Sequence, residues 1–396
     1  MLLVGPTSSS YGGSQGDPAT PDTTSLPSEP IRLFLCGDVM TGRGVDQVLP
    51  HPSNPRLHEP SIQDARLYVT LAVAANGPIP QPVDYAYIWG VALEELGRQQ
   101  PDARIINLET SITTSGDYHL FKGIHYRMHP QNVPCLTAAG IDVCALANNH
   151  LLDWGKAGLR ETLATLKQAG IQTAGAGHNL EATEAPAVVE VEGKGRILVF
   201  SYGTVSSGIP TGWRAGVNKP GVNLLADLSP AAMNRILTQV SAVKRPGDIV
   251  VASIHWGHNW GYQIPTRQRD FAHRLINEAG VDIVHGHSSH HVKGIEVYQD
   301  KLILYGCGDF ITDYEGISGH EEYRAELGIM YFADLNPANG QLVRLVLVPT
   351  RIKNFRIQRA NREETQWLAD MLNREGKELG TSVEEEEALT MMLKWD

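Results

Sequence analysis

The chain has 396 residues, of which 42% are hydrophobic, and its 33 Lys and Arg against 44 Asp and Glu give a formal net charge of −11 at pH 7. This length and hydrophobic content allow one large or two ordinary domains with a substantial core, and they exclude a chain that is disordered throughout. The acidic balance argues against a nucleic-acid partner.

The first 30 residues differ in composition from the rest of the chain. They are rich in Ser, Gly, Thr and Pro and contain almost nothing to bury, which predicts a disordered leader over residues 1–30. No apolar run approaches the roughly 20 residues that span a bilayer, and the opening MLLVG lacks the length and the basic flank of a signal peptide. On these grounds we expect a soluble protein without a transmembrane segment, and a cytoplasmic location is favoured.

From Ile31 onward, short apolar runs alternate with amphipathic stretches of helical length, which is typical of α/β proteins. The predicted core strands are 31–36, 103–108, 142–147, 247–254 and 281–286. The predicted helices are 132–140, 158–170, 229–243 and 265–280. Ser229 and Pro230 form a suitable N-cap and first-turn pair for the third helix.

The remaining β-rich segments predict antiparallel strands. Hairpins are expected within 185–203 and 291–310, and a late strand pair over 327–335 and 340–352. Strand-helix units followed by antiparallel strands predict two sheets stacked face to face with helices outside. The composition of residues 356–396 predicts a helical acidic tail, with its helix from about Arg362, in which the EEEE run at 384–387 is a solvated face.

Polar side chains follow five of the predicted strands. In open α/β sheets ligands bind at the carboxyl ends of the strands, so these side chains are candidates for one shared site. Seven of the 15 histidines also lie between residues 255 and 291. Carboxylate, imidazole and amide groups together favour one or two divalent ions of Mn, Fe or Zn. The five strand ends deliver Asp38, then Glu109, then Asn149 with His150, then His255, and then His287.

Each candidate has a simpler structural interpretation. Asp38 and Glu109 could be ordinary acids after a strand, and Asn149 with His150 could cap a helix. His258, His285 and His291 are as readily structural as functional, and His285 is expected to point into the opposite layer. Arg43 and Arg127 are candidate clamps for an anionic substrate, because a guanidinium group can hold a carboxylate or phosphate with two hydrogen bonds. Surface solvation is the alternative for Arg127.

Six segments carry a resemblance to a known family: CGDVMTGRG, INLETSIT, ALANNHLLDWG, RAGVNKPGVNLL, SIHWG and HGHSSHHVKGIEVYQDKLILYGCGDF. Together they resemble the CapA family, the poly-γ-glutamate capsule-synthesis proteins with a calcineurin-like metallophosphoesterase fold. The resemblance covers roughly residues 31–355 and implies a four-layer α/β/β/α sandwich in that region.

The resemblance also implies roles for the site residues. Asp38 would bind a first metal, and Glu109 would stand where metallophosphoesterases carry a bridging Asp. A second metal would be held by Asn149, His255 and His287, and His290 would be a further ligand of the first metal. His150 occupies the place of the catalytic histidine, and Asp153, three residues later, is the candidate partner that sets its tautomer.

The chain departs from the family pattern at four places. After His-Trp-Gly the family commonly has Glu-Tyr, whereas this chain has His258-Asn259-Trp260. Met40 stands where a metal-ligating His is usual, and Ile112 stands where phosphoesterases carry an Asp that orients the catalytic histidine. The usual Gly-Asn-Phe segment is Gly308-Asp309-Phe310 here, which adds a carboxylate near the site. These departures weaken a phosphatase interpretation.

The function implied is a role in poly-γ-glutamate capsule synthesis, with metal-dependent hydrolase chemistry on an anionic small molecule or a polyglutamate-like polymer. Capsule synthase subunits are possible partners. Two alternatives stay open: acid/base chemistry of the peptide-epimerase type, and a non-catalytic subunit for polymer binding or assembly. Relatives that act on capsule polymer are often membrane-anchored and face outward, which conflicts with the expected cytoplasmic location.

Overall fold

A computed structural model describes residues 1–8 and 29–396, so most of the predicted leader lies outside the described residues. The larger sheet of the described part has a central parallel section, β1-β2-β5-β6, and an antiparallel section that begins with β17 beside β1. A short strand, β16, also pairs parallel to β1. In spatial order the sheet consists of β20 (Thr381–Glu385), β21 (Met391–Trp395), β18 (Leu342–Lys353), β17 (Leu327–Leu335), β1 (Ile31–Val39), β2 (Ala103–Leu108), β5 (Val143–Ala145) and β6 (Gln172–Ala174), with β16 (Asp309–Ile311) beside β1 and β19 (Arg356–Arg359) beside β18.

The second sheet also has a parallel centre, flanked by the two predicted hairpins. Two further strand pairs are short: β3 (Ser111–Ile112) with β4 (Arg127–Met128), and β7 (Ala176–Gly177) with β10 (Gly221–Val222). In spatial order the second sheet consists of β11 (Leu224–Leu225), β9 (Gly195–Thr204), β12 (Ile249–His255), β13 (Ile283–His287), β15 (Lys301–Leu304) and β14 (Ile295–Tyr298), with β8 (Ala187–Val191) beside β9.

Helices cover the outer faces of the two sheets. On the larger sheet they include α1 (Arg43–Val48), α2 (Arg66–Asn76), α3 (Ala92–Gln99), α4 (Pro134–Ala138) and α5 (Gly155–Gln168). On the second sheet they are α7 (Pro230–Ser241) and α8 (Thr266–Ala279). The short α6 (Leu180–Glu184) lies against β7. Ser229 caps α7 as predicted, since its hydroxyl accepts from the backbone N–H of Ala232.

Side-chain alternation along β1 shows how the layers are held together. Ile31, Leu33 and Leu35 face the second sheet and meet apolar residues of β9, β12, β13 and β15 in one core. Phe34 and Cys36 face the other way, into a core with α1 to α5. A third core joins the second sheet to α7 and α8. The predicted four-layer α/β/β/α sandwich is therefore confirmed.

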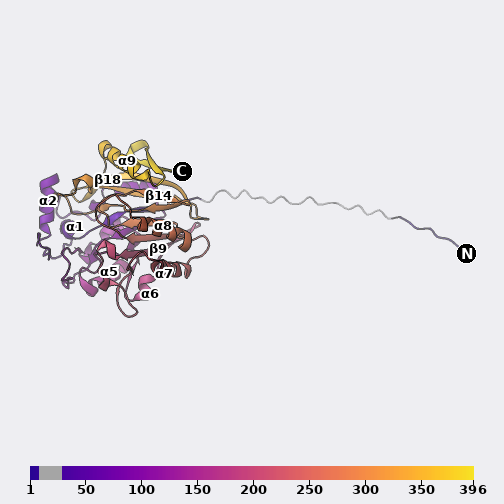
Figure 1. Ribbon diagram of the computed structural model, residues 1–396, viewed down its shortest axis with the longest axis horizontal. Helices are drawn as coiled ribbons and strands as arrows, with labels where there is room; N and C mark the ends of the chain where they lie inside the picture. The colour runs from indigo at the N-terminus through magenta and orange to yellow at the C-terminus, as the bar shows by residue number, and fades with distance from the viewer. Residues whose placement is uncertain (9–28) are drawn as a thin grey trace.

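The carboxyl-terminal segment corrects one prediction. Of the helical tail expected over residues 356–396, α9 (Arg362–Gly376) is the only α-helix, a short 3-10 helix covers Glu387–Leu389, and β19, β20 and β21 extend the larger sheet. The physical reason is the period-two pattern: Thr381 and Val383 on β20, and Met391 and Leu393 on β21, are buried while their neighbours face outward. The EEEE run is exposed, as expected. Figure 1 shows α9 at one edge of the molecule, beside β18 and β14.

Candidate metal centre

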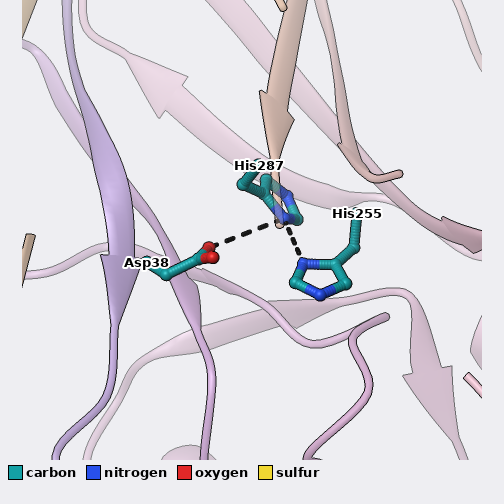
Figure 2. A group of neighbouring side chains, drawn as sticks. All are labelled: Asp38, His255 and His287. Carbon is teal, nitrogen blue, oxygen red and sulfur yellow. Dashed lines mark hydrogen bonds and ion pairs between the residues drawn. The ribbon is translucent and has the colours of Figure 1, made fainter. Parts of the chain in front are cut away.

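The five predicted strand ends meet at one place, because the parallel strands of both sheets point their carboxyl ends toward it. Asp38 is the second-last residue of β1, Glu109 follows β2, His255 ends β12 and His287 ends β13. All four are buried. Figure 2 shows Asp38 on one sheet facing the two imidazoles on the other.

Asp38 is fixed from both sheets. Its Oδ1 accepts from Asn107 Nδ2 at 2.7 Å, and its Oδ2 accepts from the backbone N–H of Ser288 at 3.2 Å. Ser288 adopts a φ of 97°, an unusual value for a residue other than Gly, and this turn directs its N–H to the carboxylate. Burial, with the nearby Asp309 charge, raises the pKa of Asp38 to about 7.

The two histidines of the second sheet form one connected pair. His255 Nδ1 lies 2.8 Å from His287 Nδ1, so one ring donates to the other. The outer nitrogens have their own partners: His255 Nε2 lies 3.1 Å from Asn149 Oδ1, and His287 Nε2 lies 2.9 Å from Ser253 Oγ. Burial lowers the pKa of both imidazoles well below the usual value, so both are neutral, as metal ligands must be.

Glu109 and Asp309 complete a second group of possible ligands. One oxygen each of Asp38, Glu109 and Asp309 lies within 4.8 Å of the others, and Asp38 also belongs to the corresponding group with His255 and His287. Glu109 Oε1 lies 3.7 Å from His255 Nε2 and 3.8 Å from His150 Nε2. Burial, together with the charges of Asp38 and Asp309, raises the pKa of Glu109 well above its ordinary value.

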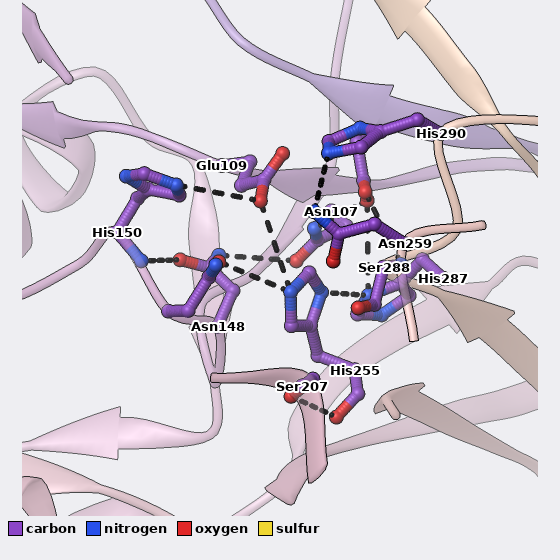
Figure 3. Close-up of polar contacts among 12 residues, drawn as sticks. Asn107, Glu109, Asn148, His150, Ser207, His255, Asn259, His287, Ser288 and His290 are labelled. Carbon is purple, nitrogen blue, oxygen red and sulfur yellow. Dashed lines mark hydrogen bonds and ion pairs between the residues drawn. The ribbon is translucent and has the colours of Figure 1, made fainter. Parts of the chain in front are cut away.

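His290 is close to this centre but is already engaged on both sides. Its Nδ1 lies 3.0 Å from Asp309 Oδ1, and its Nε2 lies 3.0 Å from Asn259 Nδ2 (Figure 3). Burial alone would lower the pKa of His290, but the Asp309 carboxylate raises it overall. In this arrangement His290 contacts a ligand candidate and is not itself in either group of three.

His150 lies beside Glu109 with Asp153 behind it. His150 Nδ1 is 2.6 Å from Asp153 Oδ2, which leaves Nε2 directed at Glu109. The ring stacks on Tyr126 with centroids 3.7 Å apart. Burial raises the pKa of Asp153 to about 6, although the adjacent Lys122 ammonium opposes that shift. Lys122, which the sequence did not single out, donates to Asp153 and to the backbone carbonyl of Asn149.

A cavity of about 1100 Å³ opens above these residues. Glu109, Asn149, His150, His290 and Lys122 are among its lining residues, while Asp38, His255 and His287 are buried below it. Tyr126, Tyr314 and Trp260 form part of its wall. A substrate in this cavity would therefore reach the centre from the side of His150 and Glu109.

The two predicted anion clamps are placed differently from what the sequence suggested. Arg43 lines the cavity but is 3% exposed, and its guanidinium donates to Asp313, Glu59 and the Tyr68 hydroxyl. Arg127 does not line the cavity: it donates to two backbone carbonyls and lies over the Trp154 ring at 3.9 Å. Both guanidinium groups are thus committed to contacts within the protein.

Two buried asparagines, absent from the sequence-based candidates, connect the site. Asn107 donates to Asp38, Asn148 donates to Asn107, and Asn148 Oδ1 accepts from the backbone N–H of His150. The available signal was their position, because Asn107 lies on β2 two residues before Glu109, and Asn148 directly precedes Asn149. His285 points into the opposite layer, as predicted: its Nε2 donates to the Cys36 carbonyl of the opposite sheet at 2.8 Å.

The residues present fit a divalent metal centre. Asp38, Glu109 and Asp309 bring three buried carboxylates together, and Asp38 also lies beside the two neutral imidazoles of His255 and His287. Within the described residues, the Glu109 carboxylate accepts no hydrogen bond. Buried carboxylates without partners are costly, and a cation removes that cost. The donor set of carboxylate and imidazole suits one or two ions of the Mn, Fe or Zn class.

Comparisons with known proteins identify the family. The family described as bacterial capsule synthesis protein PGA_cap matches residues 32–314, and the chain belongs to this family. A probable polyglutamine synthesis accessory protein of Mycobacterium tuberculosis is 49% identical over 354 residues, which is 89% of this chain and 93% of the relative.

More distant relatives carry related descriptions. The PGA biosynthesis protein CapA of Bacillus subtilis is 32% identical over 209 residues, 52% of each chain. The capsule biosynthesis protein CapA of Bacillus anthracis is 30% identical over 197 residues, 48% of this chain and 45% of the relative. A phosphatase structure from Mycoplasma pneumoniae aligns with a TM-score of 0.45 and 12% identity over 85% of this chain and 96% of that one, a likeness too weak to support a conclusion.

Over residues 1–8 and 29–396, the structure contains no helix that is both long enough and apolar enough to cross a membrane.

Proposed function

We propose that this chain is a metal-dependent hydrolase that acts on an anionic substrate, a polyglutamate-like polymer or a smaller precursor, during capsule synthesis. The observation that carries the proposal is the pair of ligand groups sharing Asp38 below a cavity lined by His150. The descriptions of the relatives, which name capsule and polyglutamine or PGA synthesis, support the substrate class.

The residues divide the work in a way that suits hydrolysis. Asp38, Glu109, Asn149, His255 and His287 would hold the metal, which when bound supplies Lewis-acid activation of a substrate oxygen. His150 would move the proton at the leaving group, because its Nδ1 is held by Asp153 and its Nε2 faces the cavity side of Glu109.

The other groups would position His150 and control access of water. Asp153 contacts the ring and is itself held by Lys122, and Asn148 accepts from the backbone N–H of His150, so both the ring and the backbone of His150 are positioned. Tyr126 stacks on the ring and separates it from bulk solvent. The metal ions and the substrate would complete a site that is otherwise strongly acidic.

The test begins with elemental analysis of the purified protein, followed by turnover of a phosphomonoester, a phosphodiester and a γ-linked glutamyl peptide. His150→Gln should lower kcat by about 10²–10⁴-fold, the usual contribution of a general acid or base, with metal content unchanged. His178→Gln is the matched control, because His178 is exposed and outside the site.

Full turnover by His150→Gln would remove the proposed acid. A metal-loaded protein that cleaves none of the three substrates would contradict the hydrolase. In that case hydrogen–deuterium exchange at the Cα of a glutamyl peptide would distinguish epimerase-type chemistry from a non-catalytic binding subunit.

A further inference from the structure

The two groups of possible ligands differ in their donor atoms. The carboxylate group consists of Asp38, Glu109 and Asp309, and the imidazole group consists of Asp38, His255 and His287. Carboxylate oxygens favour hard cations such as Mg²⁺ and Mn²⁺, whereas imidazole nitrogens suit Zn²⁺ and Fe²⁺. The same centre therefore presents two unlike donor sets that share Asp38.

Backbone pairing places Asp309 in the carboxylate group. β16 runs parallel to β1 with Asp38 and Asp309 in register, so the two carboxylates stand side by side at the end of the sheet. The approach of the two strands depends on Gly37, where an added Cβ would lie 2.0 Å from the Gly308 carbonyl oxygen. Asp309 is 4% exposed, and the pairing of β16 with β1 holds it beside Asp38.

His290 contacts the Asp309 carboxylate and orients it. Its Nδ1 lies 3.0 and 3.1 Å from the two carboxylate oxygens of Asp309, and Asn259 holds its opposite nitrogen. A carboxylate has about four acceptor positions, so Asp309 keeps lone pairs for another partner after contacting one imidazole. His290 thus acts on Asp309 as a positioning residue.

Glu109 provides an independent sign that the carboxylate group binds a ligand. It is 3% exposed, one of its carboxylate oxygens lies within 4.8 Å of an oxygen of Asp38 and of Asp309, and within the described residues its carboxylate accepts no hydrogen bond. Lys122, a nearby cation, is bonded to Asp153 instead. A buried carboxylate in this state needs a cation.

We propose that Asp309 is a metal ligand positioned by His290, and that the centre is asymmetric, with a hard cation of the Mg²⁺ or Mn²⁺ type in the carboxylate group and a Zn²⁺ or Fe²⁺ type cation in the imidazole group. This inference rests on the metal centre of the proposed function and specifies it further.

The experiment uses the full chain after treatment with a chelator, titrated with Mn²⁺ and Zn²⁺ and followed by electron paramagnetic resonance and elemental analysis. The wild type should bind both ions together. Asp309→Asn should weaken Mn²⁺ binding at least about tenfold and change Zn²⁺ binding less than about twofold. His255→Gln should do the reverse. Glu321→Gln, an exposed cavity-lining acid outside both groups, is the matched control and should bind both ions as the wild type does.

A second measurement needs no variant and so does not depend on the folding of Asp309→Asn. The Mn²⁺ signal of the Zn²⁺-loaded wild type should show no nitrogen coupling from an imidazole. Imidazole coupling to Mn²⁺, or unchanged Mn²⁺ affinity in folded Asp309→Asn, would overturn the asymmetric assignment while leaving a metal centre in place. Failure of the wild type to bind either ion would overturn the metal centre of the proposed function as well.

Discussion

Two buried acidic clusters lie near each other at this end of the molecule, and they are balanced in different ways. The paired cluster contains Glu59 and Asp313, and Arg43 donates to both from a position that is itself buried. The open cluster contains Asp38, Glu109 and Asp309; His290 contacts Asp309 at 3.0 Å, and the Lys122 ammonium is bonded to Asp153. Arginine is the usual residue for a permanent buried ion pair, because its charge and its donor geometry are fixed.

The difference shows which charges belong to the fold and which belong to a ligand. Arg43 satisfies the paired cluster in the chain alone, and Tyr68 and Tyr126 pack around its guanidinium at 3.9 and 4.7 Å. The open cluster has amide, backbone and imidazole partners but no arginine, so three carboxylates share fewer fixed positive charges than the paired cluster has, and a cation from solution would balance them. Substitutions in each cluster, combined with metal titrations, can test this division.

Arg43→Met should destabilise the protein more than a substitution at any residue of the open cluster. It leaves Glu59 and Asp313 buried without their cation, and breaking such a pair costs about 3–5 kcal/mol of unfolding free energy. Urea denaturation followed by circular dichroism measures this loss. Arg274→Met is the control, because Arg274 pairs with Glu278 on the surface of α8 and should cost about 0.5 kcal/mol or less. Equal stability of the two variants would contradict the structural role of Arg43.

The open cluster should respond to metal instead. Adding Mn²⁺ at 100 times its dissociation constant should raise the unfolding free energy of metal-free protein by about 2.7 kcal/mol, because the ion binds the folded state alone. Asp38→Asn should abolish this gain, since Asp38 belongs to both ligand groups. Thermal unfolding with and without the ion measures the effect. A variant that is still stabilised as much as the wild type would show that the ion binds elsewhere.

The strand-end residues of the centre could be predicted because one rule covers them all. Parallel strands of both sheets end at the same edge, so Asp38, His255 and His287 had to approach one another once the strands were recognised. The local sequence is enough for this, since each residue directly terminates a buried apolar run. The roles of these residues as ligands remain predictions.

The features that could not be predicted depend on contacts between segments that are distant in the sequence. β16 is three residues long and carries no strand pattern of its own, so the register that brings Asp309 beside Asp38 is visible only in the folded sheet. From the sequence alone, Arg43 could equally have bound an anionic ligand, because the two acids that pair with it, Glu59 and Asp313, lie 16 and 270 residues away in the chain. The strands β20 and β21 were not predicted because the segment is rich in charged residues, although its buried positions alternate as in a strand.

Glu109→Met should have opposite effects on metal-free and metal-loaded protein, which separates the open cluster from the paired one. Without metal, removal of a buried unpartnered carboxylate should stabilise the fold by about 1 kcal/mol. With Mn²⁺ present, the same variant should be less stabilised than the wild type, because a ligand is lost. Paired denaturation curves with and without Mn²⁺ measure both signs. Destabilisation of the metal-free protein would mean that Glu109 has a structural partner.

Lys122→Met should have the smallest effect, and it decides whether the open cluster lacks its own cation. The Lys122 ammonium is bonded to Asp153 and acts on Glu109 only through space, where it lowers the pKa that burial has raised. Removing it should strengthen Mn²⁺ binding by about twofold to threefold, the scale of one screened charge a few ångströms away. Calorimetric titration measures the change, and Lys122→Arg, which keeps the charge, is the control. If Lys122→Met strengthened binding a hundredfold, Lys122 would be the counterion of the open cluster, and the contrast with Arg43 would disappear.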